Sequence, residues 1–441
     1  MGPTDDDVDR GMIRTSSCVL QDDARPHHRE DTVQILARTA IATAGLAVVL
    51  AACGAATDAD EPGADEPDTA EVATDPADEV ERDEGPGIRE GFYWDLDEEP
   101  SSTIPISEIV SGGPPPDGIP PIDDPVYESF DDAAEWLTDD SPVMVVRGEG
   151  ETKVFPLAIM TWHEIVNDSI DGEPIVVTYC PLCNSGLAFS AEIDGQVLAF
   201  GTSGRLWRSN LVMYDRQYGN LWTQFTGESI VGERFLGQEL DRLPTTLQGF
   251  AEVRATDPDA DVLSRETGHS RSYGTNPYTG YDGVDNEPFL FRDDADGRFP
   301  AMTRVVGFPD GDGTAVLLDR VREARVVAFE DEEHPVTLWW VPGQASALDT
   351  GTIDDGRDVG QTAAFVAELD GQTLTFEPLE AAEAEADGVA RFRDTQTGSG
   401  WSLAGRAVEG DLEGESLRAV PIDDTFWFVW AVFKPDTDII S

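Results

Sequence analysis

Lysine is almost absent from this chain, and positive charge of any kind is scarce. Of 441 residues, 29 are Lys or Arg and 88 are Asp or Glu, so the formal net charge is -59 at pH 7. The lysines are Lys153 and Lys434. A surface this acidic repels the phosphates of nucleic acids and of anionic lipids, which excludes nucleic acid as a partner. So many carboxylates are typical of halophilic proteins, and we predict a salt-adapted organism.

Cysteine is also scarce, and long apolar runs are missing. The chain has 4 cysteines. Its main apolar run, residues 40–52, is shorter than the roughly 20 residues of a transmembrane helix. The run follows Arg38, ends in Leu-Ala-Ala before Cys53, and is followed by polar, acidic chain. This pattern resembles a bacterial lipoprotein signal peptide, which is cut before a cysteine whose thiol is then lipidated. We therefore expect a signal peptide over residues 1–52 and a lipid on Cys53 that anchors the protein to the outer, extracytoplasmic face of the cell membrane.

The beginning of the chain does not fit such a leader. Residues 1–31 are acidic and polar, whereas a signal peptide begins with basic residues. We expect the true start at Met12 or Val33. With the leader removed and Cys53 lipidated, Cys180 and Cys183 are the remaining thiols. Outside the cytoplasm such thiols oxidise unless they are kept reduced or bind a metal.

The segment after Cys53 is acidic and rich in Ala, Pro and Gly. Residues 54 to about 90 have almost no large apolar side chain, which predicts a disordered tether. The Pro-rich residues 112–125 predict a stiffer connector or an extended arm that lies on the domain. We therefore expect a linker over residues 53–125 and folded chain from Val126.

Beyond Val126, short β-branched and aromatic runs alternate with turn residues. This pattern predicts a mainly β fold of the α+β type with few short helices. Helices are expected near Glu135 and within residues 155–168. Asp-Gly in "AEIDGQVLAF" (residues 191–200) predicts a hairpin with a type I′ turn.

The chain repeats itself in order. "AEIDGQVLAF" returns as "AELDGQTLTF" (residues 367–376). The spacing of an Asp, a Gly and a Trp also recurs, with Asp215, Gly219 and Trp222 matched by Asp394, Gly398 and Trp401. Echoes that keep their order indicate two tandem β-rich repeats, which we place at residues 126–290 and 291–441.

The two repeats differ at the cysteines. "VVTYCPLCNSGLAF" (residues 176–189) is matched by "VTLWWVPGQASALD" (residues 336–349), which has no cysteine. The second repeat therefore folds without the pair. This asymmetry indicates that Cys180 and Cys183 form a functional site in the first repeat.

A soft transition metal is the leading hypothesis for this site. Two thiols with His163 or Met213 satisfy Cu(I), so copper is the favoured cofactor. A zinc site needs four ligands and would recruit His163 with Glu164 or Asp168.

Other functions stay open. The pair can cycle between dithiol and disulfide, or form an inert disulfide in a surface interaction module. One thiol can act as a nucleophile with His163 as base and Asn167 as its orienting group. A c-type haem is excluded, because residue 184 is Asn where that site needs His. A thioredoxin fold is disfavoured, because the residues after Cys183 predict strands and not a helix.

Three motifs together resemble a known family. They are "WHEIVNDSIDGEPIVVTYCPLCNSGLAF", "FGTSGRLWRSNLVMYDRQYGNLWTQFTGESIVG" and "YGTNPYTGY". In this order they resemble the exported bacterial and archaeal proteins known as domain of unknown function 3179. The resemblance implies no reaction, substrate or cofactor. It marks as motif positions His163, Glu164, Asn167, Asp168, Cys180, Pro181, Cys183, Ser203, Gly204, Tyr214, Asp215, Trp222 and Gly227.

A polar, turn-rich stretch lies at the end of the first repeat. Residues 264–288 predict a long loop near the cysteines, from which His269 and Tyr273 would reach the site. The sequence thus predicts a lipid-anchored protein with a Cys180–Cys183 site and leaves open whether it is an enzyme. It names no substrate or protein partner.

Overall fold

The computed structural model describes Leu96 and residues 100–331, 334–379 and 389–441. The expected signal peptide, Cys53 and the acidic tether lie outside the described residues. The described residues belong to one compact unit, Val80–Ser441. The described residues are 39% strand and 12% helix, which confirms the mainly β fold. Within the described ranges no helix is long and apolar enough to cross a membrane.

Residues 100–125 form an arm that lies on the folded chain. It contains the 3-10 helix η2 (Ile106–Glu108) and the strand β1 (Val110–Ser111). β1 pairs with β10 (Phe200–Trp207), so that Val110 is opposite Leu206. Of the two expectations for the Pro-rich stretch, the extended arm is therefore correct. The folded chain begins before the expected boundary at Val126.

The first copy of the fold contains three main sheets. Their strand orders are β15-β3-β4-β16-β2, β14-β7-β6-β5 and β1-β10-β11-β12-β13. The strands are β2 (Tyr127–Glu128), β3 (Pro142–Arg147), β4 (Thr152–Pro156), β5 (Ile165–Ile170), β6 (Glu173–Cys180), β7 (Ser185–Ser190), β8 (Glu192–Ile193), β9 (Gln196–Val197), β10, β11 (Asn210–Asp215), β12 (Leu221–Thr223), β13 (Ser229–Val231), β14 (Arg242–Leu243), β15 (Thr245–Gly249) and β16 (Asp261–Leu263). The helices are α1 (Phe130–Ala133), α2 (Leu157–His163) and α3 (Phe250–Thr256).

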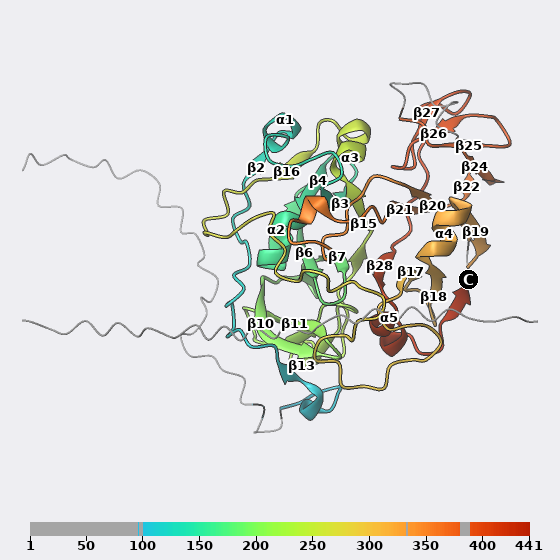
Figure 1. Cartoon of the computed structure of the whole chain (residues 1–441). Helices are drawn as coiled ribbons and strands as arrows, with labels where there is room; N and C mark the ends of the chain where they lie inside the picture. The colour runs from blue at the N-terminus through green and yellow to red at the C-terminus, as the bar shows by residue number, and fades with distance from the viewer. Residues whose placement is uncertain (1–95, 97–99, 332–333, 380–388) are drawn as a thin grey trace, which may run out of the picture. The chain divides into compact units, whose positions relative to one another are not determined.

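The second copy repeats this order (Figure 1). Its sheets are β28-β17-β18-β29, β19-β20-β21 and β24-β25-β26-β27. The strands are β17 (Arg304–Phe308), β18 (Thr314–Leu317), β19 (Val326–Glu330), β20 (Pro335–Val341), β21 (Gln361–Val366), β22 (Glu368–Leu369), β23 (Gln372–Thr373), β24 (Phe376–Pro378), β25 (Phe392–Asp394), β26 (Gly400–Trp401), β27 (Ala407–Glu409), β28 (Asp423–Phe426) and β29 (Asp438–Ile440). The helices are α4 (Leu318–Ala324), α5 (Trp427–Phe433) and the 3-10 helix η3 (Ile353–Asp355).

Strand pairing confirms the two tandem repeats. The β5-β6-β7 sheet of the first copy corresponds to β19-β20-β21 of the second. The orders β15-β3-β4-β16 and β28-β17-β18-β29 also match, and each ends in a parallel pair. The predicted hairpins form as β8–β9 and β22–β23. In the first hairpin Asp194 and Gly195 both have positive φ, 51° and 71°, as the type I′ turn requires.

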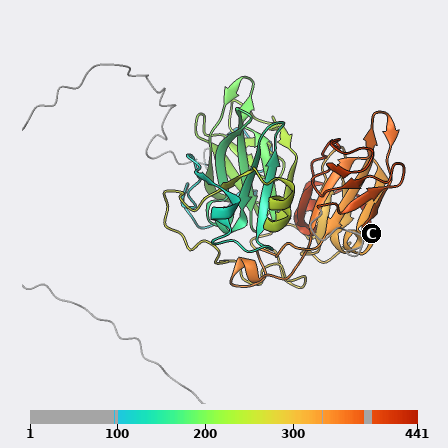
Figure 2. The same ribbon diagram turned by 90° about the horizontal axis from the view of Figure 1, so that it is seen from above.

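The two copies pack against each other through equivalent elements. β28 contacts β7 of the first copy, and β15 contacts β21 of the second. Since β15 and β28 are equivalent, as are β7 and β21, the two halves of the interface mirror each other. Figure 2 shows the green first copy beside the orange and red second copy.

The copies differ most after the strand that bears the cysteines. In the first copy a tight turn joins β6 to β7, whereas residues 342–360 form a long loop between β20 and β21 of the second. The matched segment "VTLWWVPGQASALD" forms the corresponding strand, but strand pairing shifts the match by one residue, so that Thr178 corresponds to Trp339 and not to Leu338. Its last residues do not form an equivalent turn. This loop packs on the first copy, where Ala347 and Leu348 are buried. A connecting segment, residues 264–303, has no helix or strand and includes the loop predicted over residues 264–288.

Candidate functional site

The turn between β6 and β7 brings the two cysteines together. Cys180 is the last residue of β6, and the Cys183 backbone N–H donates to its carbonyl oxygen at 3.1 Å. The two sulfurs are 3.4 Å apart and both thiols are free. A covalent S–S bond is about 2 Å long, so the pair is a reduced dithiol in contact. Cys180 is 2% exposed and Cys183 is 0% exposed.

The surroundings of Cys180 favour its thiolate. Burial opposes ionisation, but hydrogen bonds outweigh burial and lower the pKa of this thiol. They come from the Cys183 side chain and from the backbone N–H groups of Leu211, Cys183 and Leu182. A thiolate is the form of cysteine that attacks disulfides and binds metals.

The surroundings of Cys183 favour its protonated thiol. Burial, followed by the hydrogen bond and negative charge of Cys180, raises the pKa of its thiol well above the ordinary value. Its sulfur lies 3.7 Å from the Ser209 carbonyl oxygen and accepts from Asn210 Nδ2 at 3.4 Å. The two thiols therefore differ in acidity, and Cys180 is the one that ionises first.

Segments distant in sequence cover the dithiol. In the connecting segment, the Tyr281 hydroxyl donates to the Leu182 carbonyl oxygen at 3.1 Å. From β28 of the second copy, the Thr425 hydroxyl and the Phe426 backbone N–H donate to the Cys183 carbonyl oxygen at 2.8 and 3.2 Å. The site thus lies where the connecting segment and the second copy meet the first copy.

Glu164 is a buried acid next to this site. It ends α2 in the left-handed conformation, with φ 59°, and its carbonyl oxygen accepts from the Tyr179 backbone N–H at 2.8 Å. Burial, and then the charge of Cys180, raises the pKa of its carboxyl well above the ordinary value. Glu164 therefore holds its proton more strongly than an ordinary carboxyl, which disfavours a second negative charge beside Cys180.

His163 is engaged elsewhere. Its Nδ1 lies 2.7 Å from the Pro120 carbonyl oxygen, which only accepts, so Nδ1 is protonated and donates. Its Nε2 then accepts from the Tyr273 hydroxyl at 2.7 Å. Burial lowers the pKa of His163 to about 4, together with the charges of His269 and Arg271 and against the opposing effect of the Pro120 hydrogen bond. His269 and Tyr273 thus reach His163, as expected, but the imidazole has no free nitrogen to offer the dithiol.

The two candidates for a third metal ligand, His163 and Met213, lie in different surroundings. Met213 lies in the same buried cluster as the two cysteines, on the side of β11 that faces that core. Across the described ranges, no group of three or more His, Cys, Asp or Glu side chains is placed to hold a metal ion. The structure therefore brings Cys180 and Cys183 together and leaves His163 apart.

Asn167 and Asp168 serve the fold on β5. The Asn167 amide donates to the Phe200 carbonyl oxygen at 2.8 Å and accepts from the Phe200 backbone N–H at 2.7 Å. Asp168 forms an ion pair with Lys153 at 3.0 Å and accepts from the Tyr127 hydroxyl. Both side chains are thereby used away from His163 and the cysteines.

Three further motif residues hold the arm or its strand. Gly204 has φ 70°, and a Cβ at this position would lie 2.0 Å from the Pro114 carbonyl oxygen, so only glycine fits. The Tyr214 hydroxyl donates to Asp117 of the arm at 2.6 Å. The Ser203 hydroxyl donates to the Val212 carbonyl oxygen within the β10–β11 ladder. These contacts explain the motif residues without catalysis.

Asp215 and Trp222 form a clamp that recurs in the second copy. The Trp222 indole N–H donates to the Asp215 carboxylate at 3.0 Å, and Trp401 donates to Asp394 at 3.0 Å. Both carboxylates also accept backbone N–H groups of the turn that follows. The repeated spacing of Asp and Trp is therefore a structural device.

The sequence did not reveal the partners of the dithiol. Asn210 and Tyr281 lie within two of the three family motifs but were not singled out as site residues, and Phe426 lies in none of them. A signal for the Asn210 region was present in the repeats: Gln224, two residues after Trp222, corresponds to the apolar Leu403, two residues after Trp401.

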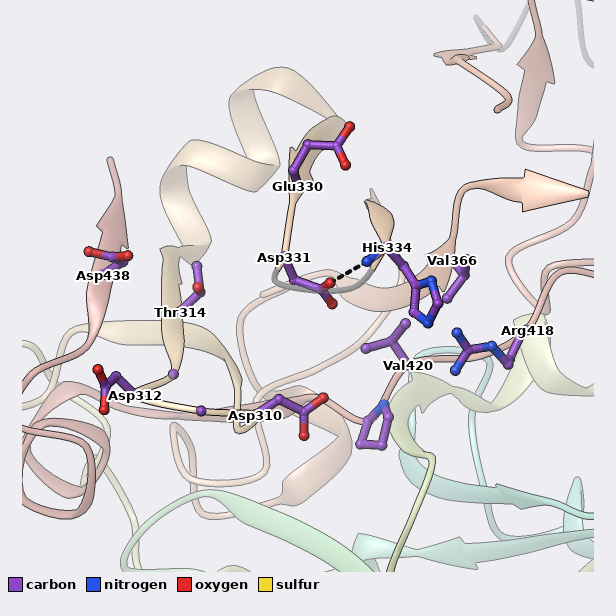
Figure 3. Close-up of a pocket in the computed structure, with 13 residues that line it drawn as sticks. Asp310, Asp312, Thr314, Glu330, Asp331, His334, Val366, Arg418, Val420 and Asp438 are labelled. Carbon is purple, nitrogen blue, oxygen red and sulfur yellow. Dashed lines mark hydrogen bonds between the residues drawn. The ribbon is translucent and has the colours of Figure 1, made fainter. Parts of the chain in front are cut away.

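An open pocket lies away from the dithiol, in the second copy. It has a volume of about 670 Å³, and its lining includes Asp310, Asp331, His334 and Arg418. Figure 3 shows Asp331 next to His334 and Asp310 farther from it in the same pocket. The His334 backbone N–H donates to Asp331 at 2.7 Å. No residue of the predicted site lines this pocket.

Comparison with known proteins supports the grouping inferred from the motifs. The model of the family described as a protein of unknown function (DUF3179) matches residues 116–437. No curated protein and no solved structure matches the chain. The match includes both copies of the fold and covers more than half of the chain. The chain therefore belongs to the DUF3179 family.

Proposed function

We propose that this protein is a thiol–disulfide exchange protein that uses Cys180 and Cys183 as its redox couple. The observation that supports this most is the 3.4 Å contact between two free sulfurs. Their opposite pKa shifts also favour exchange, because one thiolate attacks while the second thiol waits in contact.

The exchange would proceed in two steps. The Cys180 thiolate attacks a disulfide of a partner, forms a mixed disulfide and releases one partner thiolate. That thiolate takes the proton of Cys183, whose sulfur then attacks Cys180 and expels the second partner thiolate. The two cysteine sulfurs are oxidised to a disulfide, and the partner disulfide is reduced by the same two electrons.

Copper binding is the competing proposal. A thiolate at Cys180, stabilised by backbone N–H groups, would suit a soft metal ion. The partnered nitrogens of His163 favour the redox reading, because they leave the two sulfurs without that third ligand. In either case we propose that Cys53 is lipidated and that the site works on the outer face of the cell membrane.

One experiment separates these proposals. The purified protein is treated with bis(2-hydroxyethyl) disulfide, quenched in acid, alkylated with iodoacetamide at neutral pH in denaturant after the disulfide reagent is removed, and weighed intact. Exchange predicts an internal disulfide that dithiothreitol reopens, and a stable mixed disulfide in Cys183→Ser. If the protein instead forms no disulfide but holds one equivalent of Cu(I) that Cys180→Ser loses, the metal proposal is correct and the exchange proposal is wrong.

A further inference from the structure

A buried polar cluster surrounds the sulfur of Cys183. Asn210 Nδ2 donates to this sulfur at 3.4 Å and to Gln224 Oε1 at 2.8 Å. Gln224 Nε2 in turn donates to the Thr178 hydroxyl at 3.0 Å and to the Ser185 carbonyl oxygen at 3.2 Å. The side chains of Asn210, Gln224 and Thr178 are fully buried.

The orientation of the Asn210 amide is fixed by its other atom. Oδ1 accepts from the Thr223 hydroxyl at 3.0 Å and from the Phe225 backbone N–H at 3.0 Å. Because both partners are donors, the oxygen must face them, and the NH₂ group must face Cys183 and Gln224. The N–H donor is therefore held on the sulfur before any reaction begins.

The second copy shows what these positions hold without cysteines. The equivalences follow from the matched strand pairs and from the two Asp–Trp clamps. The second copy has Trp339 in place of Thr178 and Leu403 in place of Gln224, and spacing from the Asp–Trp clamp places Val389 in the sequence at the position of Asn210. Trp339 and Leu403 are both fully buried.

The comparison of the two copies shows which residues the fold itself requires. Burial of polar groups costs free energy unless every group finds a partner, and an apolar core avoids that cost. The second copy forms the same sheets with the apolar solution. The polar cluster is therefore not required by the architecture and accompanies the reactive sulfurs.

We propose that Asn210 is a further catalytic residue of the exchange reaction and that Gln224 positions it; this inference rests on the proposed function. In the second step Cys183 gives its proton to the partner thiolate released in the first step. Its sulfur, now negatively charged, forms the bond to Cys180 as the mixed disulfide breaks. The Asn210 N–H stabilises that charge as it develops, because a donor to an anion forms a stronger hydrogen bond.

The test follows the second step over pH. Closure of the internal disulfide from the mixed disulfide is timed with bis(2-hydroxyethyl) disulfide, acid quench and intact mass. In Asn210→Val, closure at pH 7 should slow on the order of 10-fold, and the pH profile should move about one unit upward. At high pH, where Cys183 ionises without help, the rate should return to that of the wild type. Formation of the mixed disulfide at Cys180 should stay within about 2-fold.

Two further variants control for effects on stability and folding. Asn220 is another buried asparagine, whose amide donates to Asp215 at 2.8 Å away from the cysteines. Asn220→Val should lower stability and leave the closure profile unchanged. Gln224→Leu introduces the residue found in the second copy. It should shift the pH profile of closure in the same direction as Asn210→Val, by a smaller amount. If Asn210→Val does not fold, Gln224→Leu provides the test.

The outcomes separate the two proposals. A wild-type protein that never forms the internal disulfide contradicts the proposed function. If the wild type forms the internal disulfide, and Asn210→Val and Gln224→Leu form it at the same rate at every pH, only the role of Asn210 is overturned.

Discussion

The two sulfurs of the dithiol are in contact, yet their surroundings differ. Cys180 accepts hydrogen bonds from three backbone N–H groups, whereas Cys183 is buried beside the negative charge of Cys180. Thiol reactivity follows the population of the thiolate. At the scale of single residues, Cys180 is therefore the attacking thiol and Cys183 the resolving thiol.

This difference predicts unequal alkylation. At pH 7 the Cys183→Ser variant, which keeps Cys180, should react with iodoacetamide at least about 10-fold faster than Cys180→Ser. Intact mass measured over time gives both rates. Unfolded in guanidinium, the two variants should react at similar rates, since burial and hydrogen bonds are then gone. Faster reaction of Cys183 in the folded state would reverse the assignment.

His163 predicts a loss of stability in acid. Its pKa in the folded chain is about 4, below its ordinary value of 6.5. Folding therefore favours the neutral ring, and this stabilisation is present above pH 6.5 and is lost as the pH falls through 4. This difference between the folded and the ordinary pKa of His163 corresponds to roughly 3 kcal/mol in the free energy of unfolding. Chemical unfolding of the wild type and of His163→Asn, which keeps a donor for Pro120, should give free energies that converge between pH 6.5 and 4. Parallel curves would contradict this account.

Sequence reasoning at this scale found the cysteines but not their partners. The spacing of Cys180 and Cys183 within a turn is local, so their contact was predictable. Asn210 reaches the site because β11 packs beside the turn, and Thr425 because the second copy docks there. Such contacts depend on tertiary packing. The same holds for His163, which bonds to the Pro120 carbonyl oxygen of the arm although it is adjacent in sequence to Glu164.

At the scale of elements, the two Asp–Trp clamps fix the same turn in each copy. Asp215 and Asp394 each accept an indole N–H at 3.0 Å in addition to backbone N–H groups. Their positions followed from the repeat in the sequence, because a turn and its clamp are local. The type I′ hairpins were predictable for the same reason.

The clamps predict matched losses of stability. Trp222→Phe and Trp401→Phe each remove one N–H donor from a buried carboxylate, which should cost about 1–3 kcal/mol. Urea unfolding of both variants should show losses of similar size, because the two sites are equivalent. A large loss in one copy with none in the other would show that the clamps are not equivalent.

At the scale of the whole molecule, the second copy supports the site in the first. Asn184, beside Cys183, donates to Asp424 at 3.2 Å, and Asp424 lies 3.5 Å from Arg304. These three residues come from both copies and are largely buried. The sequence showed that the copies exist, but the docking of β28 on β7 depends on surfaces that form only after each copy has folded.

Net charge predicts a requirement for salt. At -59, repulsion between carboxylates opposes the folded state, and added salt screens it. The midpoint of thermal unfolding should therefore rise between about 0.1 and 1 M NaCl, as the screening length falls from roughly 10 to 3 Å. Equal osmolality of sucrose is the control for effects of excluded cosolute. A midpoint that rises no more in NaCl than in sucrose would contradict salt adaptation.

The central claim is that Cys180 and Cys183 are a redox couple, and an equilibrium redox titration tests it most directly. The protein is brought to equilibrium at a series of ratios of reduced to oxidised dithiothreitol, quenched in acid, alkylated and weighed. We predict one reversible transition in which two electrons are exchanged and the dithiol closes to a disulfide, absent from Cys180→Ser and Cys183→Ser. A pair that stays reduced at every ratio, or that oxidises and cannot be reopened, would contradict the account.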